Sequence, residues 1–314
     1  MGESEKIHDV AMVGAGPAAL AAAIYTTRED LETVLYEKGV IGGLASITDW
    51  VDNYPGFPDG ISGLDLGEGL RKQAERFGAV IELGEVSAIT RKEDFIELTT
   101  TDGPVKAKAV LLATGSDYKR LGIPGEEEFY ARGVHFCATC DGAFYREKRL
   151  VVVGGGNSAI QESIFLTRFA TNIDVLVRGD KLRASEVLQH ELENYKDKIT
   201  LHYNTSPKEI VGNEGKVAGV RATQNGKDIL FETDGVFIFI GLLPNTTFLK
   251  STDVELDEIG LIRTDENLQT AIPGVFAAGD VRSGATMQIA SAVGEGATAA
   301  LRIREYLEEQ QRKQ

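Results

Sequence analysis

A short pattern that occurs twice limits the folds open to this chain: an apolar strand, a turn rich in small residues and a helix. In the first copy, the strand His8–Val13 leads into the turn at residues 14–19, and an alanine-rich stretch follows. In the second copy, Arg149–Val153 leads into the turn at residues 154–159. This order is typical of the βαβ unit that binds a dinucleotide. Because the unit is duplicated, we expect an α/β protein that binds two dinucleotides.

The length and the later strand ends indicate two domains. A chain of 314 residues is too long for one ordinary core. Ala109–Ala113 closes the first unit and Gly235–Ile240 closes the second. We therefore predict two Rossmann-like, three-layer domains, the second inserted into the first. The first domain is expected at residues 1–118 and 247–314 and the second at 119–246, with residues 308–314 fraying as a polar tail.

The charge and the apolar pattern exclude several classes of partner. The net charge of −15 disfavours nucleic acid and anionic membrane surfaces, and its plainer meaning is solubility. No apolar run approaches the roughly 18–20 residues that cross a bilayer. The segment Met1–Lys6 is not a basic region followed by an apolar one, so no secretory signal is predicted. A cytoplasmic protein is expected, with neither a nucleic-acid nor a membrane partner.

The turn at residue 14 has the features of a pyrophosphate site. Gly14 permits a tight turn, Gly16 lets the backbone approach a pyrophosphate, and the helix start offers unpaired N–H groups. Glu37 follows Gly14 by 23 positions and ends the next strand, where a carboxylate can accept hydrogen bonds from an adenosine ribose. The alternative is that Glu37 is an ordinary exposed acid.

A later strand end favours FAD over NAD as the first nucleotide. Residues 276–280 read Phe-Ala-Ala-Gly-Asp, so the strand ends in Gly279 and Asp280. A carboxylate at that turn can reach a ribityl hydroxyl, which a flavin dinucleotide has and NAD lacks. Asp280 could instead be the N-cap of a helix, or serve in both ways.

The second turn differs from the first at the position that reads the ribose. The same 23 positions counted from Gly154 lead to Val177, which cannot accept a hydrogen bond from a ribose hydroxyl. Arg178 and Arg183 follow, and guanidinium groups can pair with a 2′-phosphate. The pattern favours NADPH as electron donor and leaves NADH or another donor open, because Asp180 weakens the local positive field. Two solvated arginines are the alternative.

The chain has two cysteines, Cys137 and Cys140, in a Cys-x-x-Cys pair. A structural disulfide across so small a loop stabilises little and is rare in the cytosol. Two cysteines make half a zinc site, and no histidine has the spacing to complete it, so no metal is expected. A redox role remains, in which N–H groups of a first helical turn stabilise a thiolate. Asp141 follows directly and can donate or accept a proton, or simply cap the turn.

Several longer motifs connect these features to a known family. Residues 137–142 read Cys-Ala-Thr-Cys-Asp-Gly, residues 154–157 read Gly-Gly-Gly-Asn, and residues 273–280 read Pro-Gly-Val-Phe-Ala-Ala-Gly-Asp. Asn-Tyr-Pro-Gly at 53–56 and Ala-Thr-Gly at 113–115 extend the similarity over nearly the whole chain. Together these motifs resemble those of the bacterial-type, low-molecular-weight thioredoxin reductases, which are FAD-dependent pyridine nucleotide-disulfide oxidoreductases.

The resemblance implies a homodimer that passes electrons from NADPH through FAD and the cysteine pair to thioredoxin or a thioredoxin-like dithiol protein. It implies that Cys140 faces the flavin, that Cys137 attacks the thioredoxin disulfide, that Asp141 is the acid–base residue, and that the domains rotate relative to each other. The first domain would bind FAD, and the second would bind NAD(P)H and carry the cysteines. The residues expected to bind FAD are Gly14, Gly16, Pro17, Ala18, Glu37, Gly42, Gly43, Asn53, Ala113, Thr114, Gly115, Gly279, Asp280, Gln288 and Ile289. The residues expected to bind NADPH are Gly154, Gly156, Asn157, Ser158, Arg178 and Arg183.

Three positions depart from the family pattern. Residues 177–179 read Val-Arg-Gly where relatives carry His-Arg-Arg, so two of three expected arginines remain when Arg183 is counted. Leu44 stands where a glutamine is usual, and Met287 stands where an arginine is usual. These last two changes remove polar groups from the expected surroundings of the flavin.

Other functions use the same parts. They are a reductase for a peroxiredoxin or another dithiol protein, a dithiol oxidase that passes electrons to oxygen, and a flavin-binding redox sensor that does not turn over. A sensor has no need for an intact dithiol together with a second complete glycine turn. The thioredoxin-disulfide reductase is therefore the favoured hypothesis.

Overall fold

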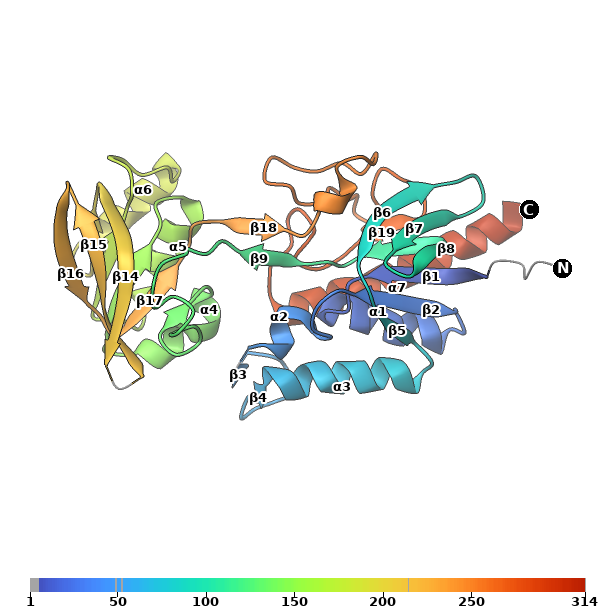
Figure 1. Ribbon diagram of the computed structural model, residues 1–314, viewed down its shortest axis with the longest axis horizontal. Helices are drawn as coiled ribbons and strands as arrows, with labels where there is room; N and C mark the ends of the chain where they lie inside the picture. The colour runs from blue at the N-terminus through green and yellow to red at the C-terminus, as the bar shows by residue number, and fades with distance from the viewer. Residues whose placement is uncertain (1–5, 49, 52, 214, 314) are drawn as a thin grey trace. The chain divides into compact units, whose positions relative to one another are not determined.

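The computed structural model describes residues 6–48, 50–51, 53–213 and 215–313 (Figure 1). The chain divides into two compact units. The first consists of the residues up to Asp117 and from Leu243 onward, and the second runs from Tyr118 to Leu242. The second unit is thus inserted into the first.

A seven-stranded sheet forms the centre of the first unit. Its strands are β1 (Ile7–Val13), β2 (Thr33–Glu37), β5 (Val80–Leu83), β6 (Val86–Arg91), β7 (Ile96–Thr100), β8 (Gly103–Leu112) and β19 (Val275–Ala277). The order along the sheet is β5-β2-β1-β8-β7-β6, and β19 also pairs with β8. β5, β2, β1, β8 and β19 are parallel, whereas β6, β7 and β8 form an antiparallel meander.

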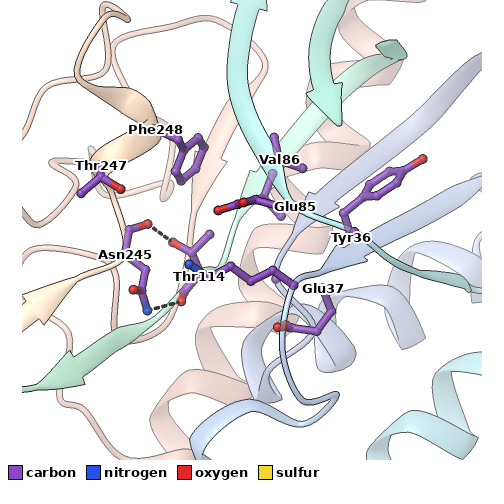
Figure 2. Close-up of a pocket in the computed structure, with 12 residues that line it drawn as sticks. Tyr36, Glu37, Glu85, Val86, Thr114, Asn245, Thr247 and Phe248 are labelled. Carbon is purple, nitrogen blue, oxygen red and sulfur yellow. Dashed lines mark hydrogen bonds between the residues drawn. The ribbon is translucent and has the colours of Figure 1, made fainter. Parts of the chain in front are cut away.

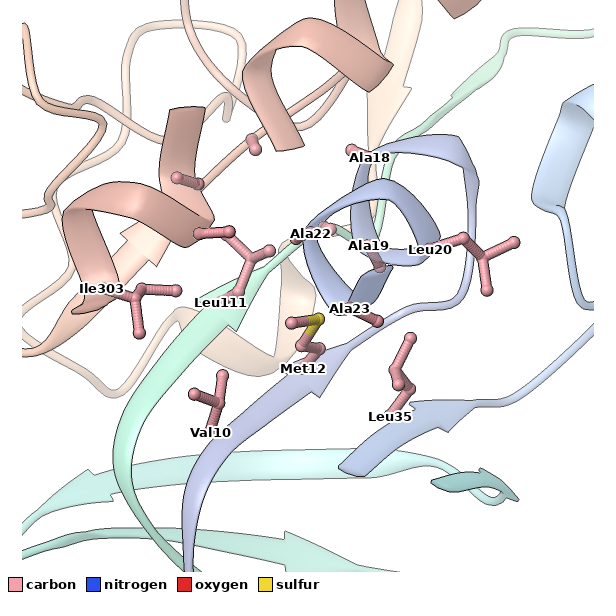
Figure 3. Packing of buried hydrophobic residues seen from close by; sticks show 14 of the residues in the cluster. Val10, Met12, Ala18, Ala19, Leu20, Ala22, Ala23, Leu35, Leu111 and Ile303 are labelled. Carbon is pink, nitrogen blue, oxygen red and sulfur yellow. The ribbon is translucent and has the colours of Figure 1, made fainter. Parts of the chain in front are cut away.

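Both faces of this sheet are covered, because successive side chains of a strand point to opposite faces. In β1, Val10 and Met12 belong to the core beneath the helices (Figure 3), whereas Ala11 and Val13 belong to the core on the other face. That second core is completed by β6, β7 and residues between 249 and 281. The helices of the unit are α1 (Pro17–Arg28), the short α2 (Gly43–Ser46), α3 (Gly63–Arg76), the single turn η3 (Thr247–Leu249) and α7 (Ile289–Lys313).

The end of α7 corrects one expectation. Residues 308–314 are expected to fray because they are polar. Residue 314 lies outside the described residues, and over 308–313 the helix continues to Lys313. Its apolar face is buried against α1 as far as Leu307. Beyond that point Arg312 pairs with Glu308 one turn earlier, at 3.3 Å. Packing of the preceding turns therefore nucleates a helical end that polarity alone does not predict.

The second unit is built on a separate parallel sheet. Its strands are β10 (Val134–His135), β11 (Arg149–Val153), β12 (Asn172–Leu176), β13 (Ile199–His202) and β17 (Gly235–Ile238). They follow the order β10-β17-β11-β12-β13. A second sheet of this unit is an antiparallel meander of three strands, β14 (Thr205–Asn213), β15 (Lys216–Gln224) and β16 (Lys227–Glu232). The helices are α4 (Ala138–Asp141), η1 (Gly142–Tyr145), α5 (Asn157–Leu166), α6 (Glu186–Leu192) and η2 (Glu193–Tyr195).

The second unit repeats the layering of the first. Leu150 and Val152 of β11 are buried with the helices, and Val151 and Val153 are buried with the meander. α5 starts at Asn157, directly after Gly156 of the glycine turn. The predicted α/β class, with two Rossmann-like, three-layer units of which the second is inserted into the first, is confirmed.

Among the described residues, four short strands lie outside these sheets. They are β3 (Trp50–Val51), β4 (Ile61–Ser62), β9 (Ser116–Tyr118) and β18 (Leu242–Pro244). β3 pairs with β4, and β9 pairs with β18 where the chain passes from one unit to the other. None of the described helices is both long enough and apolar enough to pass through a membrane.

Candidate active site

The two glycine turns are built alike. Gly14 has a φ of +98° and Gly154 a φ of +150°, a backbone conformation that glycine adopts without strain. A Cβ on Gly14 would lie 2.5 Å from the carbonyl oxygen of Ala113, and one on Gly154 would lie 2.4 Å from that of Phe239. Each turn requires glycine because it passes directly over the end of a neighbouring strand, β8 or β17.

The second essential glycine of each turn leaves the following helix start open. Gly16 and Gly156 are both extended, with φ −77° and ψ −176° in the first and φ −94° and ψ −176° in the second. Apart from the glycine and its two chain neighbours, no atom of a described residue lies within 4 Å of the position that a Cβ would take on either. The space beside each glycine is therefore open at a helix start, where N–H groups lack partners within the helix, the arrangement that binds phosphate. The first two helical residues are Pro17 and Ala18 in α1, and Asn157 and Ser158 in α5.

Glu37 holds the first turn from the side. Its Oε2 accepts a hydrogen bond from the backbone N–H of Ala15 at 2.7 Å, and its Oε1 accepts one from Gly39 at 2.7 Å. The carboxylate is thus bound to the turn backbone at the edge of a pocket (Figure 2). Its contact with a ribose stays a prediction, but Glu37 is not simply a free exposed acid.

The pocket in Figure 2 opens where β1 and β2 end. On its far side, Thr114 Oγ1 donates to the carbonyl oxygen of Asn245 at 2.8 Å, and Asn245 Nδ2 donates to the carbonyl oxygen of Thr114 at 3.1 Å. The N–H of Asn245 also donates to Gly115 at 3.1 Å. Sequence reasoning assigned the strand end at 113–115 but missed Asn245. The sequence feature that could have identified Asn245 is its position shortly after Gly241, the glycine that follows the expected strand Gly235–Ile240. Residues lining the pocket include Gly14, Glu37, Glu85, Thr114, Asn245 and Phe248.

The glycine pair at 42–43 lies against the first turn. The N–H of Gly42 donates to the carbonyl oxygen of Ala15 at 2.8 Å. A Cβ on Gly43 would lie 3.4 Å from the Cα of Gly16. The structure therefore gathers around the first turn most of the residues that the motifs single out: Gly14, Gly16, Pro17, Ala18, Glu37, Gly42, Gly43, Ala113, Thr114 and Gly115.

Asp280 lies in the turn after β19. Burial raises its pKa from 3.8 to about 6, and the nearby Glu295 carboxylate adds to the effect. The N–H of Gly279 donates to Glu295 at 2.8 Å, and Arg282 pairs with the other oxygen of Glu295 at 2.6 Å. Sequence reasoning missed this pair. α7 begins only at Ile289, so Asp280 does not cap a helix.

Two residues expected beside the flavin ring meet across a long stretch of sequence. Asn53 Nδ2 donates to Gln288 Oε1 at 3.0 Å, although 235 positions separate them. Gln288 directly precedes Ile289, the first residue of α7. Met287 has a φ of +56°, which is uncommon for a residue with a side chain. The flavin contacts of Asn53, Gln288 and Ile289 stay predictions.

The second turn carries its two arginines on the surface. Arg178 and Arg183 are exposed, and neither forms an ion pair with a residue in the described part of the chain. Two hydrogen bonds hold their segment to the turn and to the start of α5: the N–H of Arg183 donates to the carbonyl oxygen of Gly155 at 2.7 Å, and that of Ser185 donates to Asn157 Oδ1 at 2.8 Å. These guanidinium groups are thus free to pair with an anion near the start of α5.

The two cysteines form a disulfide at the start of α4. Their Cα atoms are 5.3 Å apart, and both side chains are half-buried. Cys137 caps α4, and its Sγ accepts a hydrogen bond from the N–H of Cys140 at 3.2 Å. Such a bond stabilises negative charge on that sulfur. The described residues contain no cluster of three or more side chains that could bind a metal ion.

Asp141 is the last residue of α4 and has a partner that sequence reasoning missed. Its Oδ2 lies 3.2 Å from Nδ1 of His135, the last residue of β10. The other ring nitrogen of His135 lies 2.7 Å from the hydroxyl of Tyr145. No signal in the sequence distinguishes this histidine except its position two residues before Cys137.

A disulfide in one unit and two glycine turns that fit dinucleotides define a class of flavin- and nicotinamide-dependent disulfide oxidoreductase. The family model for pyridine nucleotide-disulphide oxidoreductases matches residues 8–296, and the chain belongs to this family. Family members use a flavin and a pyridine nucleotide in general.

Within this family, the chain is similar to several thioredoxin reductases, both in sequence and in solved structures. Thioredoxin reductase from Listeria monocytogenes serovar 1/2a is 43% identical over 312 residues, which cover 98% of this chain and 97% of the relative. Thioredoxin reductase from Bacillus subtilis strain 168 is 42% identical over 310 residues, with the same coverage. The crystal structure of thioredoxin reductase from Streptococcus pyogenes MGAS5005 is 40% identical, has a TM-score of 0.92, and covers 98% of this chain and 100% of its own. The resemblance inferred from the motifs is confirmed.

Proposed function

We propose that this protein is a thioredoxin-disulfide reductase that passes electrons from a nicotinamide nucleotide through FAD to the Cys137–Cys140 pair, and from there to a thioredoxin-like protein. The observation that carries the proposal is the disulfide at the start of α4 in a chain that also has two open glycine turns. The names of the relatives support the same activity.

The first unit is assigned to FAD. The cradle at Gly14, which any Cβ would fill, and the open start of α1 suit a pyrophosphate. Asp280, at the turn after β19, is assigned to a ribityl hydroxyl, and Glu37 to the adenosine ribose. Asn53 and Gln288 are assigned to the isoalloxazine ring. When bound, the flavin supplies a pair of electrons to the disulfide.

The second unit is assigned to the nicotinamide nucleotide. Gly154, Gly156 and the start of α5 suit its pyrophosphate, with Asn157 and Ser158 in the first turn of that helix. Arg178 and Arg183 are assigned to a 2′-phosphate, so NADPH is the proposed donor. Asp180 lies between the two arginines and weakens the positive field that would attract a 2′-phosphate. NADH, which lacks this phosphate, is therefore the competing donor.

The cysteine pair carries the electrons onward. Two electrons break the bond between the two Sγ atoms, and the resulting thiolates take up two protons to become thiols. Asp141 adjoins Cys140 and is assigned as the residue that exchanges these protons. Cys137 then attacks the partner disulfide to form a mixed disulfide, and Cys140 displaces the partner as a dithiol. Both electrons and both protons leave with it.

The family resemblance also supports a homodimer as the working form and the cytoplasm as its location. The net charge of −15 argues against nucleic acid or a membrane as partner.

The proposal is tested by replacing Cys140→Ser. The variant is expected to keep its flavin and to lose reduction of thioredoxin, because a lone thiol cannot accept the electron pair as a disulfide does. Thr139→Ser is the matched control: Thr139 is exposed between the cysteines, and this variant should keep full turnover. Full thioredoxin reduction by Cys140→Ser would eliminate the relay.

Two other functions use the same cysteine pair, and an anaerobic titration separates them from the reductase. NADPH and NADH are added separately while the absorbance of the oxidised flavin is followed. A reductase is bleached by one of them and recovers its colour when oxidised thioredoxin is added. A dithiol oxidase recovers with oxygen and not with thioredoxin, and a sensor completes one reduction without turnover.

A further inference from the structure

We propose that His135 is a positioning residue that holds the Asp141 carboxylate in place beside the cysteine pair, and that Tyr145 fixes the proton on the His135 ring nitrogen that does so. The inference rests on the proposed function, because it concerns the opening of the disulfide.

The fold brings the three side chains together within eleven residues. His135 ends β10, an edge strand paired with β17 through His135 and Phe237. The chain then forms α4, which ends at Asp141, and η1, which ends at Tyr145. This reversal returns the last two side chains to the strand they have just left. The cysteines lie on the connecting stretch, so the cluster is attached directly to the redox pair.

The packing leaves His135 little freedom. Its side chain is 8% exposed, and its ring centroid lies 5.2 Å from that of Phe237 and 5.3 Å from that of Tyr145. The Tyr145 ring in turn packs edge-on against Phe237, at 5.6 Å, and over Gly235, where a Cβ would lie 2.3 Å from it. Aromatic contacts thus restrict the rings of His135 and Tyr145 independently of their hydrogen bonds.

The two hydrogen bonds define which ring nitrogen carries the proton. Burial, together with the Asp141 and Asp234 carboxylates, raises the pKa of Tyr145, so its hydroxyl stays protonated and can donate to Nε2 of His135 at 2.7 Å. With Nε2 as the acceptor, Nδ1 is the ring nitrogen that carries a proton. Nδ1 faces Asp141 Oδ2 at 3.2 Å and donates to it. The opposite tautomer would place a lone pair against the carboxylate.

A fixed carboxylate matters for the disulfide step. Opening the bond between the sulfurs of Cys137 and Cys140 takes two electrons, and the dithiol takes up two protons. Asp141 is 23% exposed, and without a partner its carboxylate would rotate toward water. With Nδ1–H of His135 bound to Oδ2, the other oxygen is held in one orientation. His135 itself is neither oxidised nor consumed.

The plain alternative is that His135 is a buried core histidine whose hydrogen bonds serve only packing. Two substitutions of His135 distinguish a positioning role from a packing role, because one removes the hydrogen-bond donor and the other removes the side-chain volume. His135→Phe keeps the volume and the aromatic contacts but loses the donor. His135→Asn loses the volume but keeps an N–H donor close to the place of Nδ1.

The rate measured is bleaching of the flavin by dithiothreitol without oxygen, in the flavin-loaded protein. Under the proposed function this dithiol reduces the cysteine pair, which then reduces the flavin, so Cys140→Ser gives the background rate. We expect His135→Phe to slow bleaching roughly tenfold to a hundredfold, since a hydrogen bond to a charged group is lost and the acid–base group is displaced. We expect His135→Asn to recover most of that loss although its thermal midpoint is lower. Tyr145→Phe, which removes one oxygen atom, is expected to slow bleaching severalfold.

A second pair of variants tests whether His135 acts through Asp141. In an Asp141→Asn background, adding His135→Phe should change the residual rate less than twofold, because the group that His135 positions is already absent. The proposal is overturned if His135→Phe bleaches as fast as the unaltered protein, or if its effect is as large in the Asp141→Asn background as in the protein that keeps Asp141. It is also overturned if His135→Asn is slower than His135→Phe.

The same measurements distinguish a failure of the proposed function from a failure of the role proposed for His135. An unaltered protein without bound flavin, or one bleached at the same rate as Cys140→Ser, overturns the proposed function and with it the role of His135. Normal bleaching of the unaltered protein combined with normal bleaching of His135→Phe overturns the role of His135 alone.

Discussion

Val177 packs against Gly155 in the second unit at the position where Glu37 hydrogen-bonds to Ala15 in the first. A Cβ on Gly155 would lie 2.8 Å from Val177 Cγ1, and Val177 is buried. In the first unit a carboxylate therefore supports the glycine turn, and in the second an apolar side chain covers it. The duplicated units keep the turn and differ in the side chain that lies beside it.

Removal of both exposed arginines, Arg178→Ala with Arg183→Ala, should raise the KM for NADPH about tenfold to a hundredfold and change that for NADH little. A charge-assisted bond to the 2′-phosphate is lost, and NADH has no such group. Steady-state kinetics with each nucleotide give the two constants. Arg221→Ala is the control, because Arg221 is an exposed arginine of β15 paired with Glu209. Equal changes for both nucleotides would show that the arginines do not read the phosphate.

Val177→Glu should turn the preference toward NADH. The new carboxylate would stand where Glu37 stands in the first unit, able to accept from a ribose hydroxyl and repelling a 2′-phosphate. The ratio of kcat/KM for NADH to that for NADPH is expected to rise roughly tenfold or more, which corresponds to about 1.4 kcal/mol. Val177→Leu keeps an apolar cover on the turn and is the matched control. A ratio that moves alike in both variants would point to altered packing alone.

Alanine at the two tight glycines should separate the two cofactor sites. Gly14→Ala is expected to lose flavin, and Gly154→Ala to keep flavin but lose reduction by NADPH, because each Cβ meets a carbonyl oxygen and each φ is positive. The conformational cost alone is about 1–2 kcal/mol. Flavin per protein is measured by absorbance, and reduction by anaerobic titration.

Gly294→Ala is the control for the two turn variants. It lies in α7 with open space around its Cβ position, so alanine should stabilise the protein by about 0.5–1 kcal/mol. Retention of flavin by Gly14→Ala would contradict the assignment of the first turn.

Asp280→Asn should affect the flavin-free protein and the flavin-loaded protein in opposite ways. The folded pKa of Asp280 is about 6 against 3.8, so the folded state binds more protons than the unfolded state between these values. Its ionisation therefore costs nothing below about pH 4 and lowers stability progressively as the pH rises to 6. A shift of about two pKa units corresponds to up to about 3 kcal/mol at pH 7. The flavin-free variant is expected to gain stability at pH 7 and not at pH 4, while flavin affinity falls.

Asp257→Asn is the control, because its effect on folding stability at pH 7 is expected to have the opposite sign. Burial acts to raise the pKa of Asp257, but hydrogen bonds from Ser283 and from the backbone of residues 259–261 outweigh it and lower that pKa. A lowered pKa stabilises the folded state above the unfolded pKa, and this contribution is lost as the pH falls. Asp257→Asn should therefore destabilise at pH 7 and have less effect at pH 4. Urea unfolding at the two pH values measures both variants, and the same sign for both would contradict the two shifts.

The features that sequence reasoning predicted share one property: they depend on residues close together along the chain. The strand, glycine turn and helix at 14 and at 154 follow from apolar runs, a positive φ and a helix start within about 15 residues. The disulfide between Cys137 and Cys140 is equally local, since two intervening residues of a helical turn bring the sulfurs together. The two Rossmann-like units follow from the repetition of these local patterns.

The features that needed the tertiary structure depend on where distant segments end. Asn53 meets Gln288 across 235 positions, and Asn245 meets Thr114 across 131, because the sheet and α7 bring those segments together. Packing on α1 carries α7 to Lys313 through residues whose polarity predicts a frayed tail. His135 is close to Asp141 in sequence, yet only the reversal of the chain after β10 turns the two side chains toward each other. Local chemistry therefore determined the class of the protein, and the path of the folded chain decided which side chains support its reactive groups.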